Sequence, residues 1–204
     1  MTLLVLDPWV EDQLRQQRAL TGADRYDEVW EGVYVMAPLP TNEHQLLVMG
    51  LSTAIHEAVT GAKIGRAYPG VNLSDRSDGW EHNYRAPDVA EFLNSTRAVD
   101  CGTHWMGAAD FLVEIISPGD RTREKLPFYD SIGVVELLLV DRDPWKLELY
   151  QRTDRGLTKS AESTPRDSGI LESAVVPLSF RLKPSQPRPQ IEVAHTQGTQ
   201  TWTV

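Results

Sequence analysis

A short, nearly continuous apolar run at residues 110–116 constrains the fold of this chain most strongly. The run reads Asp-Phe-Leu-Val-Glu-Ile-Ile, and the turn-forming residues Ser-Pro-Gly-Asp at 117–120 end it. A run of this length and composition is typical of a buried strand. Residues 134–140 form a second run of this kind, after a segment with helical character. The two runs predict a domain built around a buried sheet.

Helical and strand patterns alternate along the rest of the chain. Helices are predicted at residues 8–20, 41–60 and 121–132, where capping residues come first or apolar residues recur at helical spacing. The other predicted strands are a hairpin at 26–36 that turns at Glu31-Gly32, and segments 63–68, 71–73, 84–93, 147–151 and 175–182. Residues 94–107 are expected to form a loop or a short helix. This order predicts a mixed α/β or α+β domain around one sheet.

Length and composition fit one globular domain over residues 1–204. The chain is 41% hydrophobic and 24% charged, which is ordinary for a soluble protein. Three prolines make residues 183–190 an extended segment, and we expect the tail that follows to add one strand or to be mobile. The single cysteine, Cys101, excludes an internal disulfide and a multi-cysteine zinc site. A reducing, cytoplasmic setting is therefore expected.

Neither a membrane span nor a signal peptide is expected from the sequence. No run approaches the roughly 20 apolar residues that span a bilayer. The first residues have no basic segment, and their apolar stretch is too short for a signal peptide.

Charge is distributed unevenly along the chain. The net charge is −9, which by itself argues against a broad nucleic-acid-binding surface. The first 120 residues carry 18 acids and 8 bases, whereas residues 121–204 carry 11 acids and 12 bases. A slightly basic C-terminal part leaves room for a limited contact with nucleic acid.

Four charged residues are candidates for a functional site. Glu114 lies inside the apolar run, where a carboxylate is costly to bury unless it is paired or bound to metal. Asp88 follows Pro87 among apolar neighbours, Lys125 follows the turn after the Glu114 strand, and Glu43 opens the long helix. Each also has an ordinary explanation. Glu114 could face solvent at a strand end, and Asp88 could belong to a common Pro-Asp pair. Lys125 could be a solvated lysine, and Glu43 could complement the helix dipole.

Taken together, these residues suit metal-assisted hydrolysis of a phosphodiester. Asp88 and Glu114, on neighbouring strands, are suited to Mg²⁺ or Mn²⁺, with the carbonyl of Ile115 and waters completing the coordination. A lysine near such an ion can orient water or offset phosphate charge. Arg121 and Arg123, beside Lys125, are the candidate phosphate contacts.

The same motifs resemble those of a known nuclease family. The matching stretches are Tyr26-Asp-Glu-Val-Trp-Glu-Gly-Val-Tyr-Val-Met36, Pro38-Leu-Pro-Thr-Asn-Glu-His-Gln45, Arg85-Ala-Pro-Asp-Val89, Phe111-Leu-Val-Glu-Ile-Ile-Ser-Pro118, Glu124-Lys-Leu-Pro-Phe-Tyr129 and Gly133-Val-Val-Glu-Leu-Leu-Leu-Val-Asp141. In order and spacing they resemble the PD-(D/E)xK nuclease superfamily, and within it the Uma-two-type family of restriction-endonuclease-like proteins. The resemblance covers about residues 24–182.

The resemblance implies a restriction-endonuclease-like fold, with a central mixed β-sheet flanked by helices, and a metal-dependent DNA endonuclease. It implies that Asp88 and Glu114 are metal ligands, that Lys125 is the catalytic lysine, and that Glu43 is an accessory acid on a helix.

The sequence departs from the superfamily's pattern at two positions. Ile116 stands where the superfamily's plain pattern has lysine, and Pro127 lies early in the predicted helix, so the position of Lys125 depends on where that helix begins.

Other functions have weaker support in the sequence. Cys101 and His104 have metal-ligand spacing but too few partners for zinc, and His44 and His56 are too far apart for a compact pair. Serine-hydrolase and nucleotide-binding motifs do not appear. Aromatic residues that could stack on bases are Trp30, Trp80, Tyr84, Trp105 and Trp145. Two alternatives to a nuclease stay open: an inactive binding or assembly module, and a hydrolase of a small phosphorylated substrate. A homodimer is expected if both strands of a duplex are cut.

Overall fold

The computed structural model describes residues 2–204. Its central sheet has six strands in the order β13-β12-β11-β10-β7-β4. Their bounds are β4 Gly65–Pro69, β7 Val89–Leu93, β10 Phe111–Ile115, β11 Glu136–Arg142, β12 Trp145–Thr153 and β13 Gly156–Ser163. Strands β10 and β11 pair in parallel, and the other neighbours are antiparallel. The predicted central mixed sheet is confirmed.

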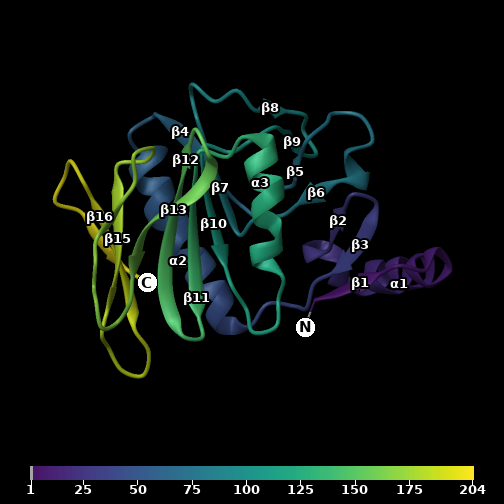
Figure 1. Cartoon of the computed structure of the whole chain (residues 1–204), viewed down its shortest axis with the longest axis horizontal. Coiled ribbons are helices and arrows are strands. Elements are labelled where there is room, and N and C mark those ends of the chain that lie inside the picture. Colours follow the sequence, from purple (N-terminus) through teal and green to yellow (C-terminus); the bar gives the residue numbers. More distant parts are fainter. Residues whose placement is uncertain (1) are drawn as a thin grey trace.

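Two helices cover opposite faces of the central sheet. Helix α2 (Asn42–Val59) packs against one face and α3 (Leu126–Ile132) against the other, as Figure 1 shows. Because side chains alternate along a strand, Val113 of β10 contacts the α2 side while Leu112 contacts the α3 side. All five residues of β10 are buried, which explains the apolar run in the sequence. Glu114 therefore points towards the α3 side.

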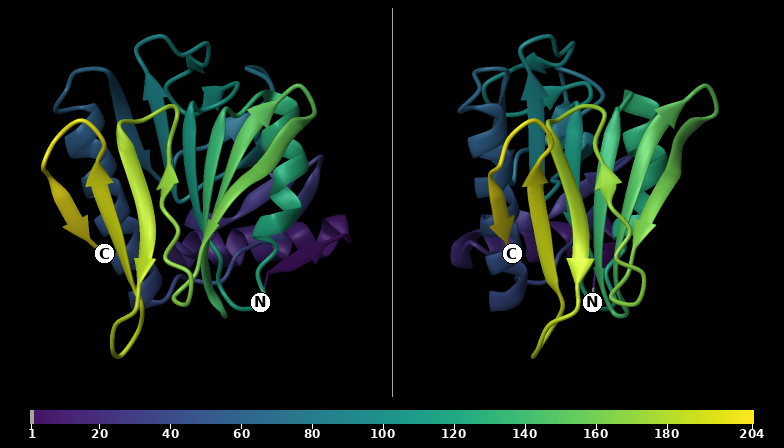
Figure 2. Two further views of the ribbon diagram at one scale, coloured as in Figure 1. Left: turned by 60° about the vertical axis from the view of Figure 1, so that its left-hand side comes forward. Right: turned by 90° about the vertical axis from the view of Figure 1, so that its left-hand side faces the viewer.

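Two smaller sheets flank this core. The first has the order β1-β3-β2-β6-β5-β9-β8, and the second has the order β14-β15-β16-β17. The strands of the first are β1 Leu3–Val5, β2 Glu28–Trp30, β3 Val33–Met36, β5 Leu73–Ser74, β6 Tyr84–Arg85, β8 Val99–Asp100 and β9 Trp105–Met106. Those of the second are β14 Leu171–Glu172, β15 Leu178–Lys183, β16 Gln190–His195 and β17 Thr201–Thr203. Figure 2 shows this C-terminal sheet beside the central sheet, where its buried residues share the core of α2.

Helix α1 (Pro8–Thr21) extends to one side of the molecule (Figure 1). Asp7 caps its N-terminus by accepting the amide hydrogens of Trp9 and Val10, and Gly22 ends it with a positive φ of 67°. The sequence predicted both ends. None of its residues is fully buried. Short 3-10 helices lie at Ala23–Tyr26 (η1), Trp80–His82 (η2) and Thr122–Lys125 (η3).

Several predicted elements are corrected by the structure. The strand predicted at 84–93 is two strands, because the chain bends at Ala86-Pro87-Asp88. Residues 94–107 contain the short strands β8 and β9, without a helix. The single predicted sheet is accompanied by two others, and β13 and β16 were not predicted. The tail after residue 190 contains two strands, most of β16 and all of β17, where at most one was expected.

Glu91 of β7 is a buried acid that forms no ion pair with any residue of 2–204. Its side chain is fully buried, both carboxylate oxygens lack a hydrogen-bond partner in the described structure, and a Cβ on Gly65 would lie 2.3 Å from its Oε1. Burial, with a contribution from Asp110, raises the pKa of Glu91 to about 8. The folded protein therefore holds a proton that the unfolded chain releases near its ordinary pKa of 4.5. Stability from this group is present at low pH and lost as the pH rises towards 8.

We expect Glu91→Gln to weaken this pH dependence. Each pKa unit corresponds to roughly 1.4 kcal/mol, so the wild type should lose about 3 kcal/mol of unfolding free energy between pH 5 and pH 8 through Glu91. Urea denaturation at the two pH values would measure the loss. Glu172→Gln, at an exposed position of β14, is the matched control and should retain the wild-type dependence. An unchanged pH dependence in Glu91→Gln would contradict this account of Glu91.

Candidate active site

Asp88 lies at the bend that ends β6 and precedes β7. Strand β7 is antiparallel to β10, with Val89 opposite Val113, so Asp88 lies beside Glu114 at the carboxyl end of β10. Its Oδ2 accepts the amide hydrogen of Ile115 at 2.7 Å. The amide and carbonyl of one strand residue point to the same side, so the Ile115 carbonyl also faces the Asp88 strand.

Glu114 is the buried acid of the site, with only 2% of the residue exposed. The hydroxyl of Tyr129, on α3, donates to its Oε1, and Lys125 Nζ lies 3.1 Å from the same oxygen. Burial raises the pKa of Glu114. Lys125 works against that rise, whereas the negative charge of Asp88 adds to it. A bound cation would relieve the repulsion between these two acids.

Lys125 is brought to these acids by the turn of η3 into α3. Its Nζ lies 2.7 Å from Glu28 Oε1 and 3.1 Å from Glu114 Oε1. Burial would lower the pKa of Lys125, but Glu114 and Glu28 outweigh it and raise the pKa. Lys125 therefore stays an ammonium. Pro127 lies in the first turn of α3, where its missing amide hydrogen costs no helical bond, so it is compatible with this position of Lys125.

Glu28, on β2, belongs to the group but was not predicted. Besides Lys125, its carboxylate accepts the amide hydrogen of Ala86 at 2.8 Å and the indole N–H of Trp30 at 2.6 Å. It thereby links the hairpin to the bend that carries Asp88. The sequence signal was weak, because Glu28 has Asp27 on one side and Val29 on the other in a predicted strand, whereas Glu114 has apolar neighbours on both sides.

His44 is a second residue that sequence reasoning missed. It lies in the first turn of α2, with 9% of the residue exposed. Its Nε2 is 2.9 Å from Asp88 Oδ1, and its Nδ1 is 3.4 Å from Ser117 Oγ. His44 and Ile115 thus hold the two carboxylate oxygens of Asp88 from different directions.

Glu43 does not join this group. Its carboxylate pairs with Arg142 at 3.0 Å and with Arg188 at 3.5 Å, and 44% of its side chain is exposed. Arg142 also donates to Ser117 Oγ at 2.8 Å. The structure therefore connects Glu43 to the site through Arg142, without bringing it beside Asp88 or Glu114.

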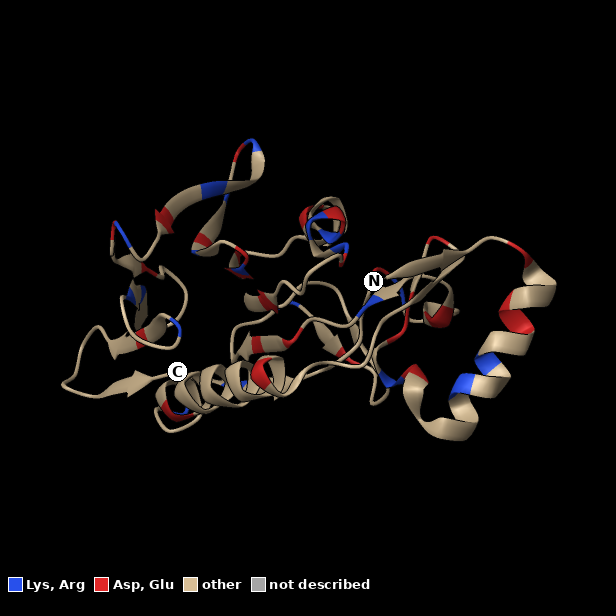
Figure 3. Cartoon of the chain, turned by 90° about the horizontal axis from the view of Figure 1, so that it is seen from below, with Lys and Arg blue, Asp and Glu red and all other residues tan. Residues whose placement is uncertain are grey.

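The two predicted phosphate contacts differ in their surroundings. Arg121 lies at the cavity and pairs with the exposed Glu124. Arg123 pairs with Asp141 at 3.0 Å and Glu148 at 2.6 Å, so its guanidinium is already engaged. Lys and Arg are interspersed with Asp and Glu along the elements seen in Figure 3, without a single basic stripe.

Asp88, Glu114, Ile115 and Lys125 line one cavity of about 390 Å³. Within residues 2–204, no three His, Cys, Asp or Glu side chains converge as a complete metal site. Two carboxylates and a backbone carbonyl nevertheless suit Mg²⁺, which commonly takes one or two carboxylates and keeps several waters. The donor set therefore fits the predicted ion.

The predicted alternatives find little structural support. Cys101 is exposed and near a backbone carbonyl, while His104 stacks on Trp80 and contacts the carbonyl of Arg76. Among the predicted aromatic residues, Trp30 lines the cavity, whereas Trp105 stacks on Phe92 in a core. Over the described residues, no helix combines the length and apolar character needed to cross a membrane.

The fold, with an acid–acid–lysine group at the ends of two interior strands of a mixed sheet, defines a restriction-endonuclease-like protein. A sequence model described as "Uma2: Putative restriction endonuclease" matches residues 10–185. The chain therefore belongs to the Uma2 family, which confirms the resemblance seen in its motifs.

A solved structure supports the fold independently. The chain is similar to a "putative nuclease belonging to DUF820" from Anabaena variabilis ATCC 29413, with a TM-score of 0.57 and 18% identity. The similarity covers 72% of this chain and 80% of that one. At this identity the likeness concerns the fold. A comparison with curated proteins finds no significant match.

Proposed function

We propose that this protein is a Mg²⁺- or Mn²⁺-dependent endonuclease that hydrolyses phosphodiester bonds in DNA. The observation that carries the proposal is the convergence of Asp88, Glu114 and Lys125 from three separate elements on one cavity. Burying a lysine together with acids costs desolvation free energy, and stability alone is a weak reason to retain such a group. Membership of a family described by nuclease activity supports the same reading.

Asp88, Glu114 and the Ile115 carbonyl would hold the metal ion. When bound, such an ion polarises a phosphoryl oxygen and lowers the pKa of water. His44 and the Ile115 amide fix the orientation of Asp88. Lys125, which stays protonated, would stabilise negative charge on the phosphate or orient the attacking water, and it would not act as a general base.

The direct test is cleavage of plasmid and single-stranded DNA with Mg²⁺ or Mn²⁺, comparing the wild type with Asp88→Ala and Lys125→Ala. The proposal expects metal-dependent cleavage by the wild type and a large loss in both variants. Equal cleavage by all three proteins would assign the activity to another site or to contamination.

Glu28 gives a further prediction for this site. Glu28→Gln keeps the side-chain size but removes the charge that holds Lys125, so Lys125 should lose its fixed position. We expect the single-turnover cleavage rate to fall by roughly tenfold, the scale seen for residues that orient catalytic groups. Substrate affinity should change little. Glu31→Gln, on the exposed turn of the same hairpin, is the control, and a rate in Glu28→Gln equal to that of Glu31→Gln would contradict the prediction.

A hydrolase of a small phosphorylated substrate is the second candidate, because the acidic groups lie in a bounded cavity. A panel of nucleotides and phosphodiesters, assayed beside DNA, separates the two activities. Hydrolysis of the small compounds with no cleavage of DNA would favour this candidate. A third possibility, an inactive binding module, predicts no binding of Mg²⁺ or Mn²⁺ in calorimetry.

A further inference from the structure

One wall of the active-site cavity is apolar and aromatic. It is formed by the β2–β3 hairpin, which also carries Glu28 of the acidic group, and by the segments beside it. The wall, as used below, consists of Tyr26, Trp30, Val35, Ala37, Pro38 and Leu39. Metal ions and phosphates gain no favourable contact from an apolar surface. The wall therefore indicates that an apolar part of the substrate lies next to the reacting phosphate.

We propose that this wall receives an unpaired nucleobase, so that the substrate is single-stranded DNA rather than an intact duplex. The inference rests on the proposed nuclease function and specifies its substrate. The cavity volume of about 390 Å³ is near the lower end of pockets that enclose small organic ligands, which is the scale of a nucleotide.

The depth of the acidic group favours a flexible strand. Only 2% of Glu114 is exposed, and the side chains of Lys125 and Asp88 are 12% and 18% exposed. A phosphate must enter the cavity to reach them. The phosphates of a duplex are held on the outside of a wide, stiff cylinder, whereas an unpaired nucleotide can bend away from its neighbours. Enzymes that do chemistry on a base at a buried site act on single strands or extruded nucleotides, and we expect the same need for a flexible strand at a phosphate site this deep.

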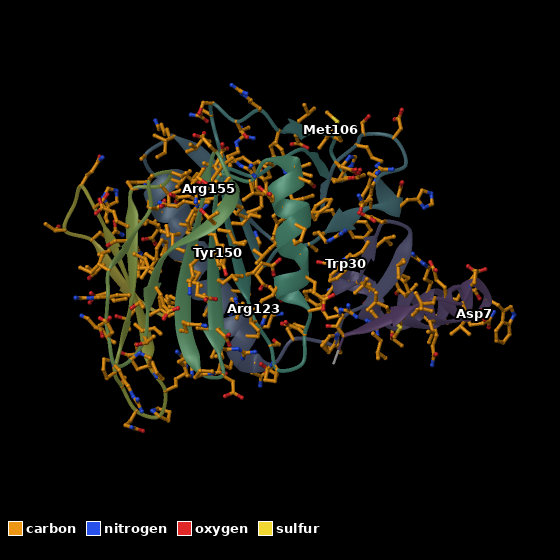
Figure 4. All side chains as sticks on the ribbon, viewed as in Figure 1. Asp7, Trp30, Met106, Arg123, Tyr150 and Arg155 are labelled. Carbon is orange, nitrogen blue, oxygen red and sulfur yellow. The ribbon has the colours of Figure 1, made fainter. Side chains whose placement is uncertain are left out.

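Trp30 has the features of a stacking platform. The guanidinium of Arg85 lies over its ring at 4.8 Å from the centroid and over Phe128 at 4.2 Å, so Arg85 links the indole to Phe128 of α3. The indole N–H is bonded to Glu28. Figure 4 shows Trp30 on the hairpin, near the end of α3 where Lys125 lies. A fixed aromatic ring at a cavity wall stacks on any base with little dependence on sequence.

Arg121 is placed to contact the adjoining phosphate. Its guanidinium also lies over the Trp30 ring, 6.0 Å from the centroid, and the side chain of its partner Glu124 is 52% exposed. Such a surface pair is weak, so Arg121 can exchange it for a phosphate. Arg121 also lines a second cavity of about 380 Å³, whose other charged residues are Arg123 and four acids. The few cations here, on a protein of net charge −9, suit a short single strand better than the charge density of a duplex.

The test is binding, measured by fluorescence anisotropy with Ca²⁺ in place of Mg²⁺. The probes are a labelled 15-nucleotide single strand and the duplex of the same sequence, each with the wild type, Trp30→Ala, Trp30→Phe and Trp9→Ala. Trp9 is 70% exposed on α1 and serves as the matched control. We expect the single strand to bind the wild type at least about tenfold more tightly than the duplex. Trp30→Ala should lose about tenfold for the single strand, the scale of one base–aromatic stack, while Trp30→Phe loses less and Trp9→Ala nothing.

Three results would overturn the inference. These are duplex binding equal to or tighter than that of the single strand, single-strand binding by Trp30→Ala at the wild-type level, and an equal loss in Trp30→Phe, which would assign the effect to the bond with Glu28. Circular dichroism verifies that each variant is folded. Cleavage assays separate this inference from the nuclease proposal: metal-dependent duplex cleavage unaffected by Trp30→Ala would leave a nuclease standing and remove the stacking role. Trp30-dependent binding without cleavage of any DNA would keep the stacking role and remove the nuclease proposal.

Discussion

Replacing Asp88 by Asn should reduce metal-dependent DNA cleavage by more than about a hundredfold, because an amide is a poor ligand for Mg²⁺ and one of only two carboxylates is lost. The fold should survive, since the amide oxygen of Asn can still accept the Ile115 amide hydrogen that Asp88 Oδ2 now accepts. Single-turnover cleavage of a labelled DNA measures the effect, and thermal unfolding verifies the fold.

Asp154→Asn is the matched control for this variant. Asp154 is exposed in the turn between β12 and β13, far along the chain from the site. Its replacement should leave the cleavage rate unchanged. If Asp88→Asn and Asp154→Asn cleave at the same rate, Asp88 has no part in the chemistry.

The second large effect is expected for Lys125→Met, which should lose both cleavage and stability. The variant leaves Glu114 buried without its counter-charge, and breaking a buried pair in this way costs about 3–5 kcal/mol. Burial already raises the pKa of Glu114, and the loss of Lys125 raises it further. A raised carboxyl pKa gives stability at low pH that is lost as the pH rises, so the deficit should be larger at pH 8 than at pH 5.

Urea denaturation at both pH values, beside Lys159→Met, would measure this deficit. Lys159 is exposed and pairs with Glu162 and with Glu148. Glu148 keeps Arg123 and Lys146 as partners in the variant, so the loss should be less than about 1 kcal/mol. Lys159→Met should therefore behave as the wild type in stability and cleavage. A Lys125→Met protein that is as stable as Lys159→Met at pH 8 would show that Lys125 does not compensate the buried acids.

Much of the fold could be predicted because its main elements carry local signals. The buried run of β10 and the caps of α1 are examples that depend on neighbouring residues alone. Strand β13 was missed because it is an edge strand with few buried residues, so its sequence lacks an apolar pattern. Strand β16 does alternate, with Ile191 and Val193 buried, but the prolines before it obscured the signal.

The candidate site could be predicted only in part, because its contacts join distant segments. Asp88 and Glu114 each stand out against apolar neighbours, and that anomaly is local. Glu28 reaches Lys125 across almost 100 residues, and the sequence contains nothing that distinguishes His44 from the adjacent Glu43 as the partner of Asp88. In the folded chain Glu43 pairs with Arg142 instead of approaching Asp88. This pairing depends on the tertiary structure and has no local signal in the sequence.

A crystal soaked with Mn²⁺, with data recorded at a wavelength that reveals the metal's anomalous signal, would show whether Asp88, Glu114 and the Ile115 carbonyl bind a metal ion. We expect an anomalous peak within coordination distance of Asp88, Glu114 and the Ile115 carbonyl, inside the cavity and beside Lys125. A fully soaked crystal with no peak there, or with Mn²⁺ only at the acids of the neighbouring cavity such as Asp141 and Asp143, would contradict it.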